Sequence, residues 1–253
     1  MEENMGTSGR KPELRTRLER VAKRGGAVAF GVASAGDADK LKRVVMDEYA
    51  PKKSQRVREI MPDAESVILF GIEASDDADE LAIRRSKRRW DYPGYLPLNL
   101  IGKDLIAALK KEGYKAVMPP ESIPRKAIAA LTSIGVYGKN SMILSEKYGL
   151  SLRIEAVVTN AKLRKDRHLK KDLCGECDRC IRACPTKAIV KPYVLDPRRC
   201  FVRISEMGTD EEELRRKFER RSFWLTPNTY LMCTICQMAC PYTSEERKRS
   251  RIG

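Results

Sequence analysis

The sequence predicts an α+β protein in two parts, a larger N-terminal domain built around one sheet and a small, loop-rich domain that carries the cysteines. Helix-like and strand-like segments alternate over residues 13–160, which is typical of helices packed on a sheet. The composition changes near residue 161, and all eight cysteines lie from Cys174 onward. The expected divisions are a flexible N-terminus (1–12), an α/β domain (13–165), a cysteine-rich domain (166–243) and a basic tail (244–253).

Four segments of the first domain have helical patterns. The first, "ELRTRLERVAKRG", is amphipathic and is followed by glycine, which commonly ends a helix. The last contains Pro124, which a helix tolerates in its first turn because an N–H there has no partner. The expected helices are residues 13–25, 37–50, 98–114 and 123–135.

Short apolar runs between these helices predict strands. The segment "ESVILFGIEA" is the clearest buried strand, and Pro62 marks a boundary before it. The expected strands are residues 27–33, 65–74, 115–120, 141–145 and 152–160.

The composition describes a globular protein with reduced thiols. Hydrophobic residues make up 42% of the chain and charged residues 34%. The apolar runs are shorter than the roughly 18 residues that a membrane span requires, and the polar N-terminus is unlike a signal or transit peptide. We therefore expect a cytoplasmic protein with no membrane association, whose eight cysteines bind metal and do not form disulfides.

The formal net charge of +15 is large. It is compatible with binding to a nucleic acid, a polyanionic cofactor or an acidic partner protein. A solvated charged surface, as in proteins of thermophiles, explains it equally well. Charge alone does not identify the partner.

The stretch "CGECDRCIRACP" has the spacing C-x2-C-x2-C-x3-C-P, which is typical of bacterial ferredoxins. Two-residue spacers let a tight loop place three thiolates around one 4Fe–4S cluster. The fourth cysteine, Cys184, lies at the start of the following segment and is expected to face a second cluster.

A second, partial motif supports this interpretation. "CTICQMACP" supplies three further cysteines, and Cys200 is the one that remains. The first cluster is then expected to take Cys174, Cys177, Cys180 and Cys240, and the second Cys184, Cys200, Cys233 and Cys236. Zinc also accepts four thiolates, but it does not explain three evenly spaced cysteines or Cys-Pro in both motifs.

The segment "SIGVYGKNSMILSEKYGLSLRIEAVVTN" (133–160), followed by these cysteines, resembles the epoxyqueuosine reductase family and the related corrinoid-dependent reductive dehalogenases. Residues 58–72 and 196–201 also resemble family segments, and the similarity spans roughly residues 13–243. The positions that match the family's G-x-x-GKN-S segment are Gly135, Gly138, Lys139, Asn140 and Ser141.

This resemblance implies a nitroreductase-like first domain that holds base-off cobalamin, and a ferredoxin-like second domain that passes electrons through two 4Fe–4S clusters to cobalt. It also implies removal of an epoxide oxygen from a modified tRNA nucleoside, with electrons from a donor of ferredoxin or flavodoxin type. The five matching residues would bind the corrinoid, the glycines by letting the backbone approach it closely. A plain turn with a solvated lysine is the alternative.

The sequence departs from the family at the proton donor. The family's aspartate aligns with Pro119, so Glu121 and Tyr137 are the candidate donors. Glu121 equally fits an exposed acid at the start of a helix. The only histidine, His168, lies in a charged linker and is an unlikely cobalt ligand or general base.

The sequence also departs from the family in length. Many family members have a helical-repeat domain that binds tRNA, and this sequence, which ends at Gly253, has no counterpart of it. Basic segments would then hold any tRNA: residues 84–89, residues 162–171 and the tail. The neighbouring "RRWDYPGY" could stack a base, line a cofactor pocket or pack on the sheet.

Two other functions stay open at this point. The chain could be a two-cluster electron-transfer protein without a corrinoid, as loss of the aspartate would suggest. It could also be a reductive activator of another corrinoid protein.

Overall fold

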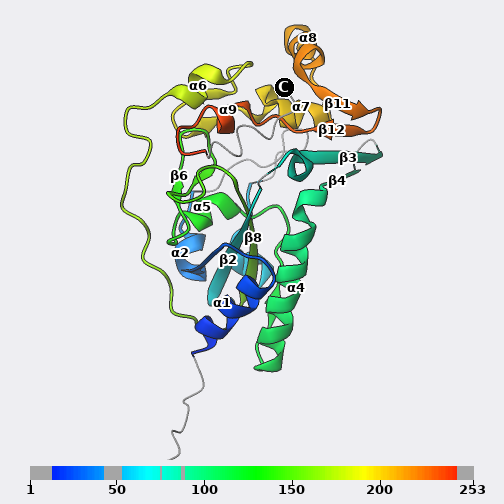
Figure 1. The fold of residues 1–253 in the computed structure, drawn as a ribbon. Coiled ribbons are helices and arrows are strands. Elements are labelled where there is room, and N and C mark those ends of the chain that lie inside the picture. The colour runs from blue at the N-terminus through cyan, green and yellow to red at the C-terminus, as the bar shows by residue number, and fades with distance from the viewer. Residues whose placement is uncertain (1–12, 43–52, 75, 87–88, 244–253) are drawn as a thin grey trace, which may run out of the picture.

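The computed structural model describes residues 13–42, 53–74, 76–86 and 89–243 (Figure 1). The first domain is built around an antiparallel sheet with the strand order β1-β2-β8-β5. These strands are β1 (Ala29–Ser34), β2 (Ser66–Glu73), β8 (Leu152–Thr159) and β5 (Ala116–Val117). The two central strands are buried along nearly their whole length, which explains the continuous apolar run of β2.

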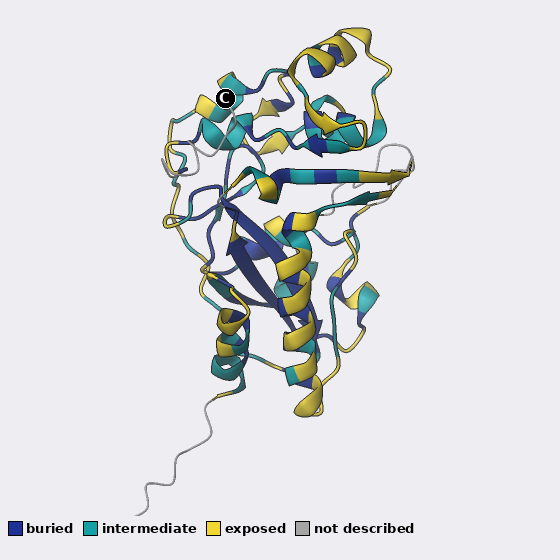
Figure 2. Cartoon of the chain, turned by 45° about the vertical axis from the view of Figure 1, so that its right-hand side comes forward, coloured by how far each residue is buried: buried dark blue, intermediate teal, exposed yellow. Residues whose placement is uncertain are grey.

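Helices cover both faces of this sheet. They are α1 (Leu14–Arg24), α2 (Ala35–Asp39), α3 (Val57–Ile60), α4 (Leu96–Lys111) and α5 (Arg125–Ala129). The long helices α1 and α4 share a core with Ile68 and Phe70, whereas α2, α3 and α5 share one with Val67 and Leu69. Alternate residues of β2 thus face opposite cores. Figure 2 shows the strands buried between helices whose outer sides are exposed.

A short hairpin follows α5 and leads back to the sheet. Its strands are β6 (Val136–Tyr137) and β7 (Ile143–Leu144), which pair antiparallel. The turn between them holds residues 138–142 and therefore most of the GKN segment.

The cysteine-rich part consists of short elements. They are α6 (Arg179–Ala183), β9 (Ile189–Lys191), β10 (Val194–Leu195), η3 (Pro197–Arg199), α7 (Phe201–Met207), α8 (Glu212–Arg221), β11 (Phe223–Thr226), β12 (Thr229–Leu231) and α9 (Ile235–Met238). Helices α6 and α9 lie against each other. Each follows the first cysteines of one motif, so their contact brings the two motifs together.

A second four-stranded sheet joins the two parts of the chain. Its order is β11-β12-β3-β4, where β3 (Leu81–Ser86) and β4 (Arg89–Asp91) precede α4 and are flanked by η1 (Asp77–Glu80) and η2 (Pro93–Tyr95). Tyr230 of β12 is only 1% exposed and lies in the core of this sheet. One sheet therefore contains strands from both sides of the predicted division at residue 165, and that division stays a prediction.

Most of the predicted elements of the first domain are present. Helices 13–25 and 98–114 correspond to α1 and α4, and strands 27–33, 65–74 and 152–160 correspond to β1, β2 and β8. The predicted α+β class is confirmed, because helices pack on antiparallel sheets.

Other elements are shorter than predicted or were not predicted. Strand 115–120 ends after Val117, before two prolines that lack an N–H for a strand ladder, and strand 141–145 is reduced to β7. Helix 123–135 was too long: Thr132 Oγ1 donates to the Ala129 carbonyl and accepts from the Ile134 N–H, which ends the helix. Of helix 37–50, only α2 is seen, and residues 43–50 lie outside the described residues.

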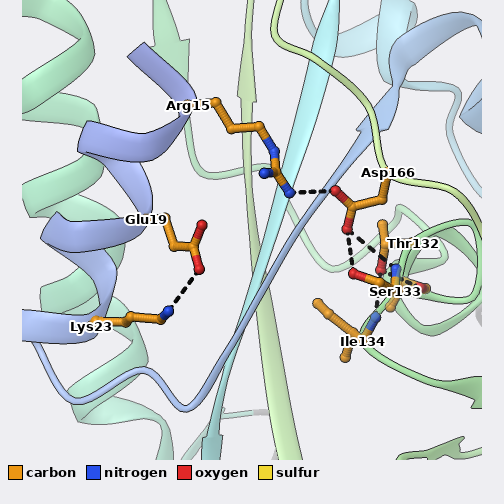
Figure 3. A network of polar contacts seen from close by, with 8 residues as sticks. Arg15, Glu19, Lys23, Thr132, Ser133, Ile134 and Asp166 are labelled. Atoms are coloured by element: carbon orange, nitrogen blue, oxygen red, sulfur yellow. Dashed lines mark hydrogen bonds and ion pairs between the residues drawn. The ribbon is translucent and has the colours of Figure 1, made fainter. Parts of the chain in front are cut away.

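The charged linker after β8 has no helix or strand, but it is held firmly against the first domain. The Asp166 N–H donates to the Val32 carbonyl at 2.8 Å. Its carboxylate pairs with Arg15 at 2.5 Å and accepts from the Ser133 hydroxyl at 2.7 Å (Figure 3). His168 is exposed in this segment, as expected. Among the described helices, none has the length and apolar character needed to cross a bilayer.

Candidate functional site

The first cysteine set meets in one pocket. Its four members, Cys174, Cys177, Cys180 and Cys240, all line this pocket together with residues of the GKN segment. The pKa of Cys180 is raised by burial and then by the charges of the other three, since neighbouring like charges disfavour ionisation. These four thiols are therefore close together although Cys240 lies 60 residues from Cys180 in the numbering.

The thiols of the second set also lie near one another. Burial raises the pKa of Cys236 to about 12, and the charges of Cys233, Cys200 and Cys184 add to this effect. Cys184 also receives an N–H···S hydrogen bond from Ala188 at 3.2 Å. Although burial acts in the opposite direction, the hydrogen bonds to Cys184 lower the pKa of that thiol and prepare it as a thiolate.

Two sets of clustered thiols suit iron–sulfur clusters. Within the described ranges, no three His, Cys, Asp or Glu side chains gather closely enough for a single metal ion. A 4Fe–4S cluster instead binds one thiolate at each of four iron corners. Iron would offset the mutual repulsion that raises the thiol pKa values.

The GKN segment forms the turn of the β6–β7 hairpin. The Gly138 N–H donates to the Met142 carbonyl at 2.8 Å, and Ser141 has a left-handed backbone with φ 62°. A Cβ on Gly135 would lie 2.5 Å from the Leu144 carbonyl oxygen of the paired strand. The close approach that requires glycine at position 135 is thus one between two segments of this chain.

Lys139 joins this hairpin to the first cysteine loop. Its Nζ donates to the carbonyl oxygens of Gly175 at 2.5 Å and Cys177 at 3.1 Å, and its own carbonyl accepts from the Tyr193 N–H at 3.0 Å. The lysine is therefore not simply solvated: two of the three N–H donors of its ammonium group fix the cysteine loop against the first domain.

Asn140 offers a buried donor on the wall of the same pocket. The residue is only 4% exposed, and its Oδ1 accepts from the Met142 N–H at 3.3 Å. Its Nδ2 is buried and has no hydrogen-bond partner. A buried amide without a partner is costly, so this atom fits a group that supplies an acceptor, such as a cluster sulfur or a cofactor amide.

In front of the second cysteine set lies Lys126. The residue is exposed to solvent, and desolvation by the neighbouring protein lowers the pKa of its ammonium group. The charges of Cys200 and Cys236 act on it, and its Nζ donates to Met142 Sδ at 3.1 Å. Lys126 of α5, Met142 of the β6–β7 hairpin turn and the second cysteine set are thus close together.

The predicted acids occupy different environments. Glu121 is exposed, and its charge acts on Tyr92, Glu155 and Glu206. Tyr137 instead packs against the core beneath the main sheet. No hydrogen bond among the described residues links either candidate to the cysteines.

Sequence reasoning missed Glu206. It lies on α7, six residues after Cys200, and accepts a hydrogen bond from the Tyr92 hydroxyl. Burial raises the pKa of the Glu206 carboxyl and also that of Tyr92. No local motif marks Glu206, because its partner lies 114 positions earlier in the chain.

The aromatic residues of "RRWDYPGY" pack within the fold. The Trp90 ring lies 6.4 Å from that of Trp224, Tyr92 contacts Glu206, and the Arg153 guanidinium lies 4.9 Å from the centre of the Tyr95 ring. Of the three interpretations, packing on a sheet is therefore confirmed: Trp90 and Tyr92 pack on the core of the second sheet and Tyr95 on a core of the main sheet.

The cysteine-rich part and the whole chain both resemble known proteins. Residues 173–243 match the family described as 4Fe-4S double cluster binding domain, which confirms that this part binds two such clusters. An epoxyqueuosine reductase of Synechocystis is 32% identical over 204 residues, covering 76% of this chain and 68% of that protein. The chain belongs to the epoxyqueuosine reductase family. A Lactococcus garvieae epoxyqueuosine reductase is 30% identical over 196 residues. The aligned region covers 72% of this chain and 53% of that relative.

Solved structures agree on the fold. A Bacillus subtilis epoxyqueuosine reductase structure, with its catalytic loop swung out of the active site, matches 92% of this chain and 66% of its own, with a TM-score of 0.67 and 23% identity. The reductive dehalogenase NpRdhA, in complex with 3-bromo-4-hydroxybenzoic acid, matches 97% of this chain and 35% of its own, with a TM-score of 0.59 and 15% identity. The fold implied by the resemblance is confirmed.

Proposed function

We propose that this member of the family is an epoxyqueuosine reductase-type oxidoreductase, which removes the epoxide oxygen of a modified nucleoside in tRNA. The observation that carries the proposal is the shared pocket, in which the GKN hairpin and the first cysteine set meet. Release of an epoxide oxygen as water consumes two electrons and two protons. The protein must therefore accept electrons from outside and hold a proton source near the substrate.

The eight cysteines divide between two clusters as their spacing suggests. We propose Cys174, Cys177, Cys180 and Cys240 as ligands of the first, and Cys184, Cys200, Cys233 and Cys236 as ligands of the second. When bound, the clusters and cobalamin supply low-potential electrons and a reduced metal for the deoxygenation. Asn140 and Ser141 of the hairpin and Lys126 beside the second set would hold the corrinoid, while Lys139 holds the cysteine loop.

The different surroundings of the two sets give the proposed site a direction. Tyr193 and Tyr242 flank the first set and are 42% and 39% exposed, so an external donor would dock there. The second set faces Lys126. A low-potential carrier of ferredoxin or flavodoxin type suits this arrangement, and the reducing cytoplasm suits the free thiols.

We propose Glu121 as the proton donor that takes the place of the family's aspartate, with Glu206 as a second candidate and Tyr137 as a third. The carbonyl oxygen of Pro119 accepts a hydrogen bond from Arg125 Nη2 at 3.0 Å, so Pro119 helps to hold the conformation of this loop. Glu121 is exposed beside Tyr92 and Glu206, where a substrate could reach it.

The test combines binding and turnover in anaerobically reconstituted protein. We expect added cobalamin to bind at micromolar concentration, with an altered absorption spectrum, and epoxyqueuosine in tRNA to be converted to queuosine under reducing conditions. Glu121→Gln should lose turnover but keep corrinoid binding, with Glu206→Gln as the comparison variant. Reducible clusters without any corrinoid binding would contradict the proposal.

The alternative without a corrinoid, a two-cluster electron-transfer protein, has one observation in its favour: Pro119 replaces the expected acid. Such a protein would reduce a partner, which could be another corrinoid protein, and would leave tRNA unchanged.

A further inference from the structure

The second sheet has one face that is unlike the other. Its inner face carries Tyr230 and Ala82, which pack with α7 and α8. The strand register places Phe223 opposite Leu231 and Thr229 opposite Ile83, so Phe223 and Ile83 belong to the outer face. Within the described residues, neither is part of a hydrophobic core.

Strand β11 forms the edge of this sheet and is exposed at every residue. Phe223 is 44% exposed, Trp224 37% and Leu225 48%. An apolar edge strand invites unwanted pairing, and proteins usually cover or charge it. Phe223 lies on the outer face, whereas Trp224, opposite Tyr230, lies on the other face and packs beside Trp90 and Tyr230. Large apolar side chains exposed on an uncovered edge are typical of a contact surface.

Positive charge surrounds this strand. Arg220 and Arg221 end α8, one residue before the strand begins, and are exposed. From the other hairpin, the Arg84 guanidinium lies 5.5 Å from the centre of the Trp224 ring, and its Nη2 donates to the Pro227 carbonyl at 2.8 Å. The β3–β4 hairpin brings Arg89 as well, whereas its Arg85 is neutralised by Asp91 at 2.6 Å.

We propose that this surface, the aromatic edge (Arg220, Arg221, Phe223, Trp224 and Leu225), binds unpaired nucleotides of an RNA. The inference rests on the proposed function, because an enzyme that acts on tRNA needs a surface that binds RNA. Exposed aromatic rings stack bases of any sequence, and neighbouring arginines bind phosphates or stack as well. Arg84, 140 residues before Trp224 in the chain, adds a further positive charge beside this surface.

Charge decides between RNA and a second copy of this chain. Two copies meeting at the aromatic edge would bring four arginines together in a protein whose net charge is already +15. A polyanion gains from the same charges. An acidic protein strand would use the charge too, but it would leave the aromatic rings without stacking partners.

Fluorescence anisotropy with a labelled, unmodified tRNA anticodon stem-loop tests the surface in reconstituted protein. Phe223→Ser/Leu225→Ser should weaken binding about tenfold, through lost stacking and apolar contact. Arg220→Gln/Arg221→Gln should lower the slope of log affinity against log salt by about 1.5. The matched control is Lys110→Gln/Lys111→Gln, which removes two exposed charges at the far end of α4 (Figure 1).

The outcomes separate this inference from the proposed function, because binding is measured without electron donor or turnover. The proposal for the aromatic edge is wrong if the wild-type protein fails to bind the stem-loop. It is also wrong if the edge variants bind as tightly as the control, even if tRNA is turned over. Intact binding without turnover would count against the function alone. A dimer that Phe223→Ser/Leu225→Ser dissociates, with RNA affinity unchanged, would assign the surface to a second copy. Circular dichroism and iron content identify any variant that has misfolded.

Discussion

Lys139 connects two parts of the molecule through one ammonium group. It extends from the turn of the β6–β7 hairpin, and both of its acceptors, Gly175 and Cys177, lie in the first cysteine loop. Charge-assisted hydrogen bonds to carbonyl oxygens are stronger than neutral ones, and here they hold a loop without a helix or strand. The position of the first three thiols thus depends on a residue of the first domain.

We therefore expect Lys139→Met to lose iron selectively from the first cysteine set. Two carbonyl oxygens lose their donor, and the loop that holds Cys174 and Cys177 becomes free to move. After anaerobic reconstitution, iron should fall from about eight toward about four atoms per chain, with one of two EPR signals lost. Lys147→Met, at an exposed lysine near Tyr148, is the control. Full iron content in Lys139→Met would contradict this role.

Among the elements, α6 and α9 carry the crossing between the two clusters. Cys184 is the C-cap of α6, and Cys240 follows α9. Since these helices lie against each other, the last cysteine of each motif reaches the set formed mainly by the other motif. A single helix contact therefore ties residues 174–184 to residues 233–240.

This crossing predicts that Cys184→Ala loses the second cluster and largely spares the first. Three thiolates would remain in the second set, while the pocket lined by Cys174, Cys177, Cys180 and Cys240 is untouched. EPR of the reduced protein, with iron counting, measures this. Cys180→Ala is the matched comparison and should affect the first cluster. Loss of the same signal in both variants would exclude the assignment of ligands.

The sequence was informative where partners lie close together and uninformative where they do not. Cysteine spacing and the GKN turn are local patterns, so both sets and the hairpin could be found from them. β11 and β12 also form a hairpin, around Pro227 and Asn228, and α8 has the pairs Glu212–Arg216 and Glu213–Lys217; both are local signals that reasoning overlooked. The pairing of β12 with β3 joins residues 229–231 to 81–83 and leaves no local trace.

At the scale of the whole molecule, the core of the second sheet lies directly beside cysteines of the second set, so bound metal should stabilise this sheet. Its core uses Phe201, which directly follows Cys200, and Met232, which directly precedes Cys233. The main sheet, by contrast, has two cores of its own that contain no cysteine. Loss of iron should therefore weaken the second sheet and leave the first largely intact.

Both tryptophans of the chain, Trp90 and Trp224, lie in the second sheet, so their fluorescence reports its state. We expect the iron-loaded protein to unfold in one transition, by tryptophan fluorescence and by far-ultraviolet circular dichroism alike. After anaerobic chelation, the fluorescence transition should move to lower temperature and separate from the main loss of ellipticity. The reason is that α1, α4 and the main sheet keep their contacts when the thiols are empty. Coincident transitions in the chelated protein would show instead that the two sheets unfold together, with or without iron.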